Sequence, residues 1–151
     1  MLIRKPQDQY DIMAMETLAR KMHAEGAFRG LDYDVRKVLA IGDQLLHNPD
    51  YFGVLCEHDD EIIGLMVCYI TEFYFGTDKI AQDMVLYIDK TRRGGVGGLR
   101  MIEHYVEWAV EKGAKEIQLG QTVGIDADAV AKLYAHAGFE LIGQLYKRRV
   151  E

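Results

Sequence analysis

Residues 86–102 join an apolar run to an amphipathic segment through a loop rich in arginine and glycine. In order, the segment contains Leu86-Tyr87-Ile88, then Arg92-Arg93, then Gly94-Gly95-Val96-Gly97-Gly98. Glycine has no Cβ, so such a loop can turn tightly and let a ligand approach the backbone. The helix that follows begins with unpaired N–H groups at the positive end of its dipole. The pattern predicts a strand, an anion-binding loop and a helix.

Three kinds of glycine-rich phosphate loop compete for this segment. A Walker loop requires Lys followed by Ser or Thr after its last glycine, whereas Gly98 is followed by Leu99-Arg100. A dinucleotide fingerprint is expected in the first strand–helix unit, with a different glycine spacing. The third kind is the Arg/Gln-x-x-Gly-x-Gly/Ala loop of the GNAT acetyltransferases, which Arg92–Gly97 resembles directly. A register that begins at Arg93 is preferred, because it places Gly98 and the apolar residues of the helix at the usual positions.

A second segment, Leu133-Tyr134-Ala135-His136-Ala137-Gly138-Phe139, resembles the Leu-Tyr-x-x-x-Gly-Phe segment of the same family. The resemblance implies that acetyl-CoA is the acyl donor and that Tyr134 protonates the departing thiolate. Ala127 stands where the family often has an asparagine. The resemblance also implies which residues bind the cofactor: Leu86, Tyr87, Ile88, Arg92, Arg93, Gly94, Gly95, Val96, Gly97 and Gly98. The phrase Leu86–Gly95 is also similar to a subgroup common in phage and prophage genomes.

Periodicity predicts the order β-α-α-β-β-β-α-β-α-β-β, with helices at about residues 8–25, 34–47, 97–112 and 126–136. The last two strands, 139–142 and 145–150, are expected to form a terminal hairpin. This order predicts an α/β (α+β) fold: one mixed, mostly antiparallel sheet with helices on both faces. It is also the order of the acyl-CoA N-acyltransferase (GNAT) fold. We expect residues 1–151 to form a single domain, since the sequence shows no linker or repeat.

Transfer of an acetyl group to an amine requires polarisation of a carbonyl and removal of a proton from the amine. Backbone N–H groups of residues 86–88 are candidates for the first task. Asp83 interrupts an apolar strand beside the expected cofactor site and is the candidate base, with Glu72 as the alternative. The expected substrate pocket is walled by Phe73-Tyr74-Phe75, Tyr33 and Phe28, although core packing explains these rings equally well.

The formal charge of −6 argues against a nucleic-acid partner and mildly favours a cationic or neutral substrate. No long apolar stretch or signal peptide is found at residues 1–6 or beyond, so we expect no membrane partner and a cytoplasmic protein. Cys56 and Cys68 are expected to be core thiols. The histidines share no ligand spacing, so no metal is expected. The oligomeric state stays open, and a homodimer is compatible with the sequence.

The leading hypothesis is therefore an acetyl-CoA-dependent N-acetyltransferase for a primary amine of a small molecule or a protein. The first alternative is an acyl-CoA-binding regulatory or degenerate GNAT domain without turnover. It is favoured by Ala127 and by Val96, which in the preferred register stands where the family has glycine. The second is a toxin-like enzyme that acetylates aminoacyl-tRNA, against which the acidic charge weighs.

Overall fold

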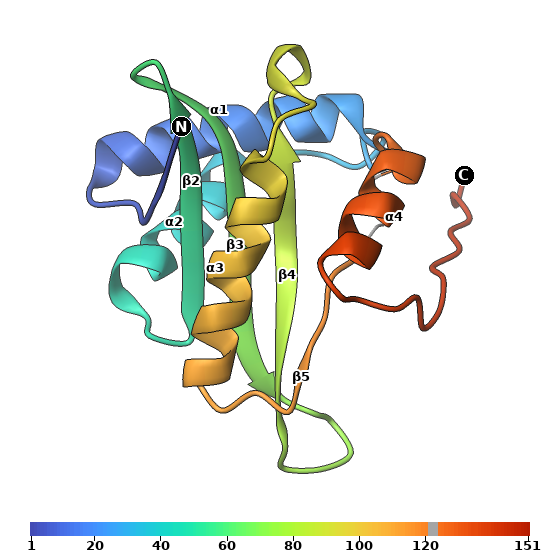
Figure 1. The fold of residues 1–151 in the computed structure, drawn as a ribbon. Helices are drawn as coiled ribbons and strands as arrows, with labels where there is room; N and C mark the ends of the chain where they lie inside the picture. Colours follow the sequence, from blue (N-terminus) through green and yellow to red (C-terminus); the bar gives the residue numbers. More distant parts are fainter. Residues whose placement is uncertain (121–123) are drawn as a thin grey trace.

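The computed structural model describes residues 1–120 and 124–151, and Figure 1 shows how its elements are arranged. The N-terminal half consists of β1 (Leu2–Arg4), α1 (Gln9–Glu25), α2 (Val35–His47), β2 (Tyr51–His58) and β3 (Glu61–Glu72). Then follow β4 (Lys79–Ile88), the 3-10 turn η1 (Lys90–Arg92), α3 (Gly97–Glu111), β5 (Glu116–Ile117) and α4 (Ala127–His136). The expected elements are present as far as α4, with small differences at their ends.

A five-stranded sheet in the order β1-β2-β3-β4-β5 forms the centre of the molecule. The first three pairings are antiparallel and only β4–β5 is parallel. One face of the sheet packs against α1 and α2 through Leu55, Leu65, Val67 and Tyr87. The other face packs against α3 and α4, with Tyr105 and Met101 of α3 fully buried there (Figure 1). The predicted mixed sheet with helices on both faces is confirmed.

Local sequence explains where the elements begin and turn. The carboxylate of Asp8 accepts a hydrogen bond from the Asp11 N–H at the start of α1, and Asp34 does the same for two N–H groups of α2. Such caps satisfy donors that have no partner within the helix. Asp59 and Asp60 have φ values of 52° and 60° and connect β2 to β3. Acidic residues tolerate this left-handed conformation better than most residues do.

The edge of β4 that faces β5 is paired over only a short length. Ile80 and Ala81 pair with Glu116 and Ile117, and the Gln118 N–H donates to the Ala81 carbonyl at 2.9 Å. No described residue extends this pairing toward Ile88. The Asp89 N–H donates to the Ile63 carbonyl of β3. Backbone groups alternate in direction along an antiparallel ladder, so those of Leu86 and Ile88 point away from β3, toward the free edge of β4. This edge therefore offers backbone donors and acceptors beside α3.

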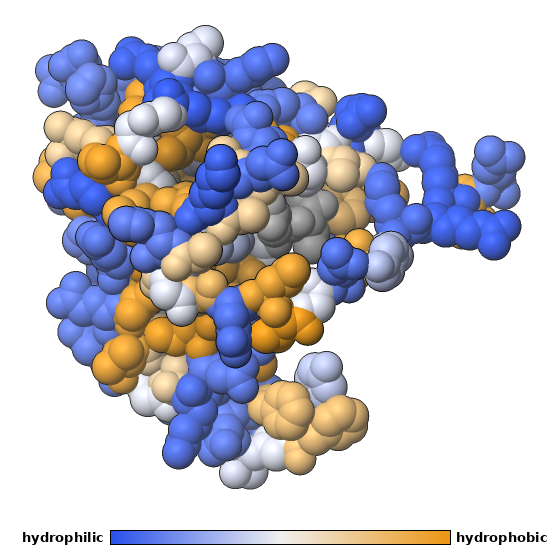
Figure 2. All heavy atoms as spheres, turned by 45° about the vertical axis from the view of Figure 1, so that its right-hand side comes forward, coloured by the Kyte–Doolittle hydropathy of each residue, from blue (hydrophilic) through white to orange (hydrophobic). Residues whose placement is uncertain are grey.

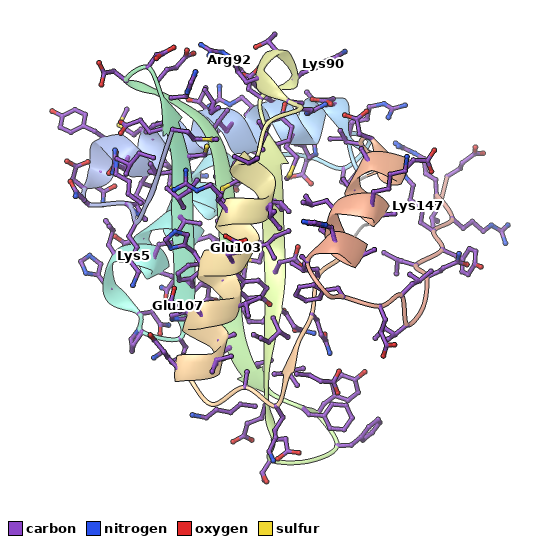
Figure 3. All side chains as sticks on the ribbon, viewed as in Figure 1. Lys5, Lys90, Arg92, Glu103, Glu107 and Lys147 are labelled. Carbon is purple, nitrogen blue, oxygen red and sulfur yellow. The ribbon has the colours of Figure 1, made fainter. Side chains whose placement is uncertain are left out.

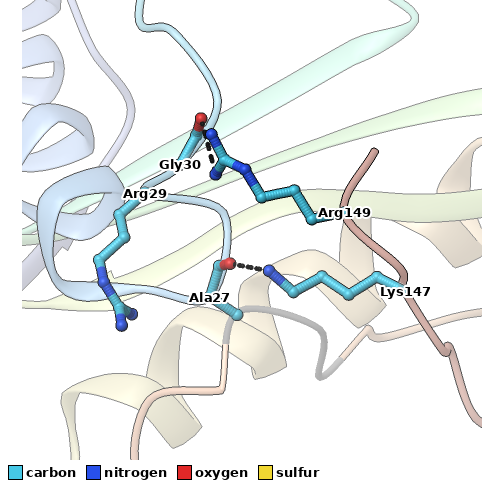
Figure 4. Close-up of a pocket in the computed structure, with 5 residues that line it drawn as sticks. All are labelled: Ala27, Arg29, Gly30, Lys147 and Arg149. Carbon is cyan, nitrogen blue, oxygen red and sulfur yellow. Dashed lines mark hydrogen bonds between the residues drawn. The ribbon is translucent and has the colours of Figure 1, made fainter. Parts of the chain in front are cut away.

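The expected terminal hairpin is wrong for this structure, because residues 139–151 form no strand. This segment leaves α4 through Gly138, whose φ is +91°. It is held by side chains: Lys147 donates to the Ala27 carbonyl, and Arg149 donates to the Gly30 carbonyl at 3.4 Å (Figure 4). Its apolar side chains are exposed, with Leu141 at 81% and Ile142 at 80%. The apolar pattern that suggests a strand thus has no partner edge here. Figure 2 shows further apolar patches on the side of the molecule that carries α4.

None of the helices within the described ranges combines the length and the apolar character that a membrane span requires.

Candidate active site

A bulge in β4 turns Asp83 toward α4. Val67 pairs with Val85 and Cys68 pairs with Asp83, so Met84 is an extra residue without a partner on β3. Val85 and Tyr87 contact the core below α1 and α2, whereas Ala81 contacts the opposite core. In a regular strand, Asp83 would share a face with Val85 and Tyr87. The bulge places it instead on the face of Ala81, among groups that belong to α3, α4 and the end of β5.

Asp83 and Tyr134 both bind Gly120, which lies just beyond β5. The Gly120 N–H donates to Asp83 Oδ1 at 2.8 Å, and the Tyr134 hydroxyl donates to the Gly120 carbonyl at 2.7 Å. The structure thus brings together the two predicted catalytic residues, which are 51 positions apart in the sequence (134 − 83). Glu72, the alternative base, is exposed at the end of β3 and pairs with Lys79.

Burial shapes the electrostatics of this pair. It raises the pKa of Asp83 to about 6, although the Gly120 N–H stabilises the carboxylate and works against this shift. Burial, together with the negative charge of Asp83, also raises the pKa of Tyr134. The same two causes raise the pKa of the Cys68 thiol, which lies opposite Asp83 on β3. The site therefore contains a carboxylate that accepts a proton near neutral pH and a phenol that stays protonated.

The glycines of the loop have different tasks. Gly94 has a φ of +101°, a conformation that side chains rarely adopt. A Cβ at Gly97 would lie 3.1 Å from Cys56 Sγ, and one at Gly98 would lie 3.1 Å from Leu133. These two glycines therefore let α3 pack closely on the sheet and on α4. At Gly95 a Cβ would meet nothing within 4 Å, so this position faces open space.

The N-terminus of α3 has no side-chain cap. Val96 occupies the cap position, and its side chain cannot accept a hydrogen bond. The Arg100 N–H is the first to bond within the helix, to the Val96 carbonyl. The N–H groups of Gly97, Gly98 and Leu99 come before that bond, so helix geometry gives them no intrahelical partner. This helix end lies beside the end of β4, because a Cβ at Gly97 or Gly98 would lie 3.5 or 3.8 Å from Ile88 Cδ1. Together they could hold a phosphate and an extended amide chain.

The two arginines of the loop already have acidic partners. Arg93 donates to both oxygens of Glu25 at 2.8 and 2.9 Å, and its Nε donates to the Ile88 carbonyl at 2.9 Å. Arg92 lies on η1 near Lys90, as Figure 3 shows, and its guanidinium bonds Glu61 at 2.6 Å. Arg93 thus organises the loop before any ligand binds.

Arg93 is the centre of a network that the sequence did not reveal. Glu25 at the end of α1 accepts from Arg93 and also from the Tyr87 hydroxyl at 2.8 Å. Asp126, just before α4, bonds Arg93 at 3.2 Å, and the guanidinium lies over the Tyr87 ring. The bond from Arg93 is the main cause that lowers the pKa of Glu25. Because Arg93 and Glu25 are 68 positions apart, no local pattern could predict their contact.

The expected aromatic substrate pocket is not assembled. In the β3–β4 loop, Phe73 stacks on Tyr74 and Phe75 meets both rings edge to face. Tyr74 and Phe75 are more than 80% exposed. Tyr33 lines a cavity between α1 and α2, whereas Phe28 lies under Lys147. Cys56 and Cys68 are buried free thiols, as predicted. Within residues 1–120 and 124–151, no group of His, Cys, Asp and Glu is arranged to hold a metal ion.

Comparison with known proteins identifies the family. Residues 13–139 match the model of the acetyltransferase (GNAT) family, and the chain therefore belongs to that family. The acetyltransferase AAC(6')-Iy, solved with a CoA-linked bisubstrate analogue, has a TM-score of 0.78 at 15% identity over 99% of this chain and 97% of that one. A search of curated proteins gave no match.

Two further solved structures share the fold. A ribosomal-protein-alanine N-acetyltransferase from Brucella melitensis biovar Abortus has a TM-score of 0.71 at 15% identity over 99% of this chain and all of that one. An aminoglycoside acetyltransferase from an uncultured soil metagenomic sample has a TM-score of 0.72 at 18% identity, covering 99% and 96% of the two chains. The predicted GNAT fold and family are thus confirmed, whereas the acceptor substrates of these proteins differ from one another.

Proposed function

We propose that this protein transfers an acetyl group from acetyl-CoA to a primary amine by direct attack. The observation that carries the proposal is the meeting of Asp83 and Tyr134 at Gly120, beside the unpaired edge of β4. A base and an acid with separated pKa values are what acyl transfer from a thioester to an amine requires. Membership of the acetyltransferase family supports the same reaction class.

The described residues fit acetyl-CoA as the donor. The uncapped start of α3 and the open space at Gly95 suit its pyrophosphate, which needs N–H donors and close approach of the backbone. The backbone N–H and carbonyl of Leu86 and the N–H of Ile88 suit the amide-rich pantetheine arm and the thioester carbonyl, whereas the Ile88 carbonyl already accepts from Arg93 Nε. Bound there, acetyl-CoA would supply an activated acyl group.

In the proposed reaction, Asp83 takes a proton from the amine nitrogen as that nitrogen forms a bond to the acyl carbon. The N–H of Leu86 or Ile88 polarises the carbonyl, and the carbon–sulfur bond breaks. Tyr134 gives its proton to the sulfur and regains one from solvent, while Asp83 releases its proton to solvent. The products are an amide and the free thiol of CoA. Alignment of the reactants supplies a further large share of the rate, up to about 7–11 kcal/mol.

The test combines two measurements on the purified protein. Calorimetry with CoA should show binding that is lost in Gly95→Trp, because a bulky side chain would block the free space at this position. Release of thiol from acetyl-CoA should then depend on an added amine. Binding without amine-dependent release would instead support the non-catalytic acyl-CoA-binding domain. Unchanged CoA affinity in Gly95→Trp would overturn the assignment of this loop.

A further inference from the structure

A cavity of about 270 Å³ lies between α1, α2 and the sheet, on the side opposite Tyr134. Most of its wall is apolar. The apolar part is lined by Ile12, Met15, Ala19, Met22, Val38, Ile41, Leu45, Leu65, Val67, Met84 and Val85. At roughly 30 Å³ for each water-sized atom, the cavity holds a molecule of about nine non-hydrogen atoms.

Three polar side chains, Glu16, His23 and Tyr33, line the same cavity. Glu16 is only 7% exposed, and its Oε1 accepts from Arg20 at 2.7 Å and from the Tyr33 hydroxyl at 3.4 Å. Oε2 receives no hydrogen bond from any residue that the structure describes. His23 Nε2 is buried and likewise lacks a hydrogen-bond partner among those residues. Buried polar atoms are normally paired, so His23 Nε2 calls for a ligand of matching chemistry, and Glu16 Oε2 lines the same cavity with acceptor capacity to spare.

The chemistry of these three groups favours a cation. A carboxylate oxygen, a neutral imidazole nitrogen and a hydroxyl oxygen can all accept hydrogen bonds, and an ammonium group has three N–H donors. Arg20, the partner of Glu16, has a 59% exposed side chain, so solvent screens its charge while Oε2 stays available. The negative net charge of the chain also favours a cationic ligand.

The cavity borders the strand that carries the proposed reaction centre, from the face of the sheet opposite Asp83. Met84 and Val85 form part of its wall, Asp83 directly precedes them and Leu86 directly follows. Met84 is the bulge residue and is 39% exposed, so the cavity wall at this point borders solvent. A ligand anchored at Glu16 could therefore extend past the apolar wall toward β4.

We propose that this cavity binds the acceptor, and that the acceptor is a small diamine. One protonated nitrogen is held by Glu16 Oε2, His23 Nε2 and the Tyr33 hydroxyl. The methylene chain lies against the apolar wall, and the second nitrogen extends past Met84 to the edge of β4 at Leu86, where it receives the acetyl group. This assignment rests on the proposed acetyl transfer for its last step, whereas the anchoring at Glu16 does not.

The test uses 1,5-diaminopentane and, as a probe of equal length without the second charge, n-pentylamine. Binding of each is measured by calorimetry to the full chain without acetyl-CoA. We expect the diamine to bind at least tenfold more tightly than the monoamine. Glu16→Gln should remove this preference, and Tyr33→Phe should reduce it. Glu107→Gln on the exposed surface of α3 is the matched control and should keep it (Figure 3).

Equal affinities for the two probes, or a preference that survives in Glu16→Gln, would overturn the proposal. If Glu16→Gln does not fold, Tyr33→Phe decides, because it keeps the ring and removes only the hydroxyl. Thiol release from acetyl-CoA is then measured with both probes. Diamine binding without any thiol release would contradict the proposed function and leave the anchoring site intact. Thiol release that is equal with both probes would support the proposed function and contradict the diamine assignment.

Discussion

Tyr134 has a packing role in the fold and a chemical role in the proposed reaction. Its ring packs against the core under α4, and its hydroxyl donates to the Gly120 carbonyl. The raised pKa means that this hydroxyl stays protonated at neutral pH, so it has a proton to donate to a departing thiolate.

Tyr134→Phe separates these two roles. The ring packing is retained, so we expect acetyl-CoA affinity to be nearly unchanged and the free energy of unfolding to fall by only about 1 kcal/mol. Turnover should fall by about 10²–10⁴-fold in both kcat and kcat/KM. Steady-state kinetics and thermal melting measure the two effects. Wild-type turnover in this variant would exclude Tyr134 as the acid.

Asp83 is predicted to link activity and stability to pH. Its folded-state pKa of about 6 lies above the ordinary carboxyl value, so the folded protein binds this proton more tightly than the unfolded chain. Stability from this residue therefore falls as pH rises from about 4 to about 6, while the active carboxylate form increases. We expect kcat/KM to rise with an apparent pKa of about 6.

Asp83→Asn should remove the rise of kcat/KM near pH 6 and lower kcat by about 10²–10⁴-fold. The amide oxygen can still accept from the Gly120 N–H, and the buried charge is gone. The variant should therefore be at least as stable as the wild type at pH 7, by up to about 3 kcal/mol. Urea unfolding at pH 4 and pH 7 measures this difference. An unchanged profile for kcat/KM would show that another group is the base.

Variants of Arg93 and its neighbours distinguish a pyrophosphate contact of Arg93 from a role in loop structure alone. If it contacts the pyrophosphate, Arg93→Ala should weaken CoA about tenfold or more, and more than Arg92→Ala. Glu25→Gln breaks the ion pair but leaves the guanidinium in place, so CoA affinity should then be kept or increased. If Arg93 only organises the loop, Glu25→Gln should weaken CoA as much as Arg93→Ala does. Calorimetry distinguishes these outcomes.

Among the elements, α3 shows how a binding site can lower the stability of a helix. Its first turn carries no acidic residue, and Val96 provides no cap. An acidic side chain there would stabilise the helix dipole by about 0.3–1 kcal/mol at an exposed position. The sequence instead leaves the positive end of the dipole free for an anion.

Val96→Asp tests whether the start of α3 gives up helix stability for anion binding. We expect the free protein to become slightly more stable, because Val96 is 56% exposed and the new charge faces the helix N-terminus. The affinity for CoA should fall at least tenfold, because the carboxylate repels and replaces the pyrophosphate. Val96→Asn is the control, because asparagine has the shape of aspartate without its charge. This variant should lose less CoA affinity than Val96→Asp. If CoA binds Val96→Asp as well as it binds the wild type, the anion site lies elsewhere.

Across the molecule as a whole, ion pairs join different elements and couple its stability to pH. Arg4 is the main cause that lowers the pKa of Asp11, and Arg93 that of Glu25, while Lys21 lowers the pKa of Asp89 to about 2. Each of these carboxyl groups holds its proton less tightly in the folded protein. Their contribution to stability is present above the unfolded pKa near 4 and is lost as pH falls toward 2.

The stability curve of the whole chain should therefore fall on both sides of about pH 4–5. Below that range, the paired carboxylates lose their charge and stability drops steeply. Between about pH 4 and 6, Asp83 produces a shallower decline, which Asp83→Asn should abolish while the acid limb stays. Urea unfolding across pH 2–7 measures both limbs. A curve that rises steadily from pH 4 to 6 would contradict the burial of Asp83.

The sequence by itself determined the order of elements to α4, the glycine loop and the Leu133–Phe139 segment, because these depend on local periodicity, capping and turn residues. It also singled out Asp83 and Tyr134, but not their meeting at Gly120. Only the tertiary structure decided that meeting, because one extra residue in β4, Met84, selects the face on which Asp83 lies. The Arg93–Glu25 pair and the cavity at Glu16 likewise come from contacts between segments far apart in the chain. The expected terminal hairpin was wrong because an alternating pattern makes a strand only where a neighbouring edge accepts its hydrogen bonds.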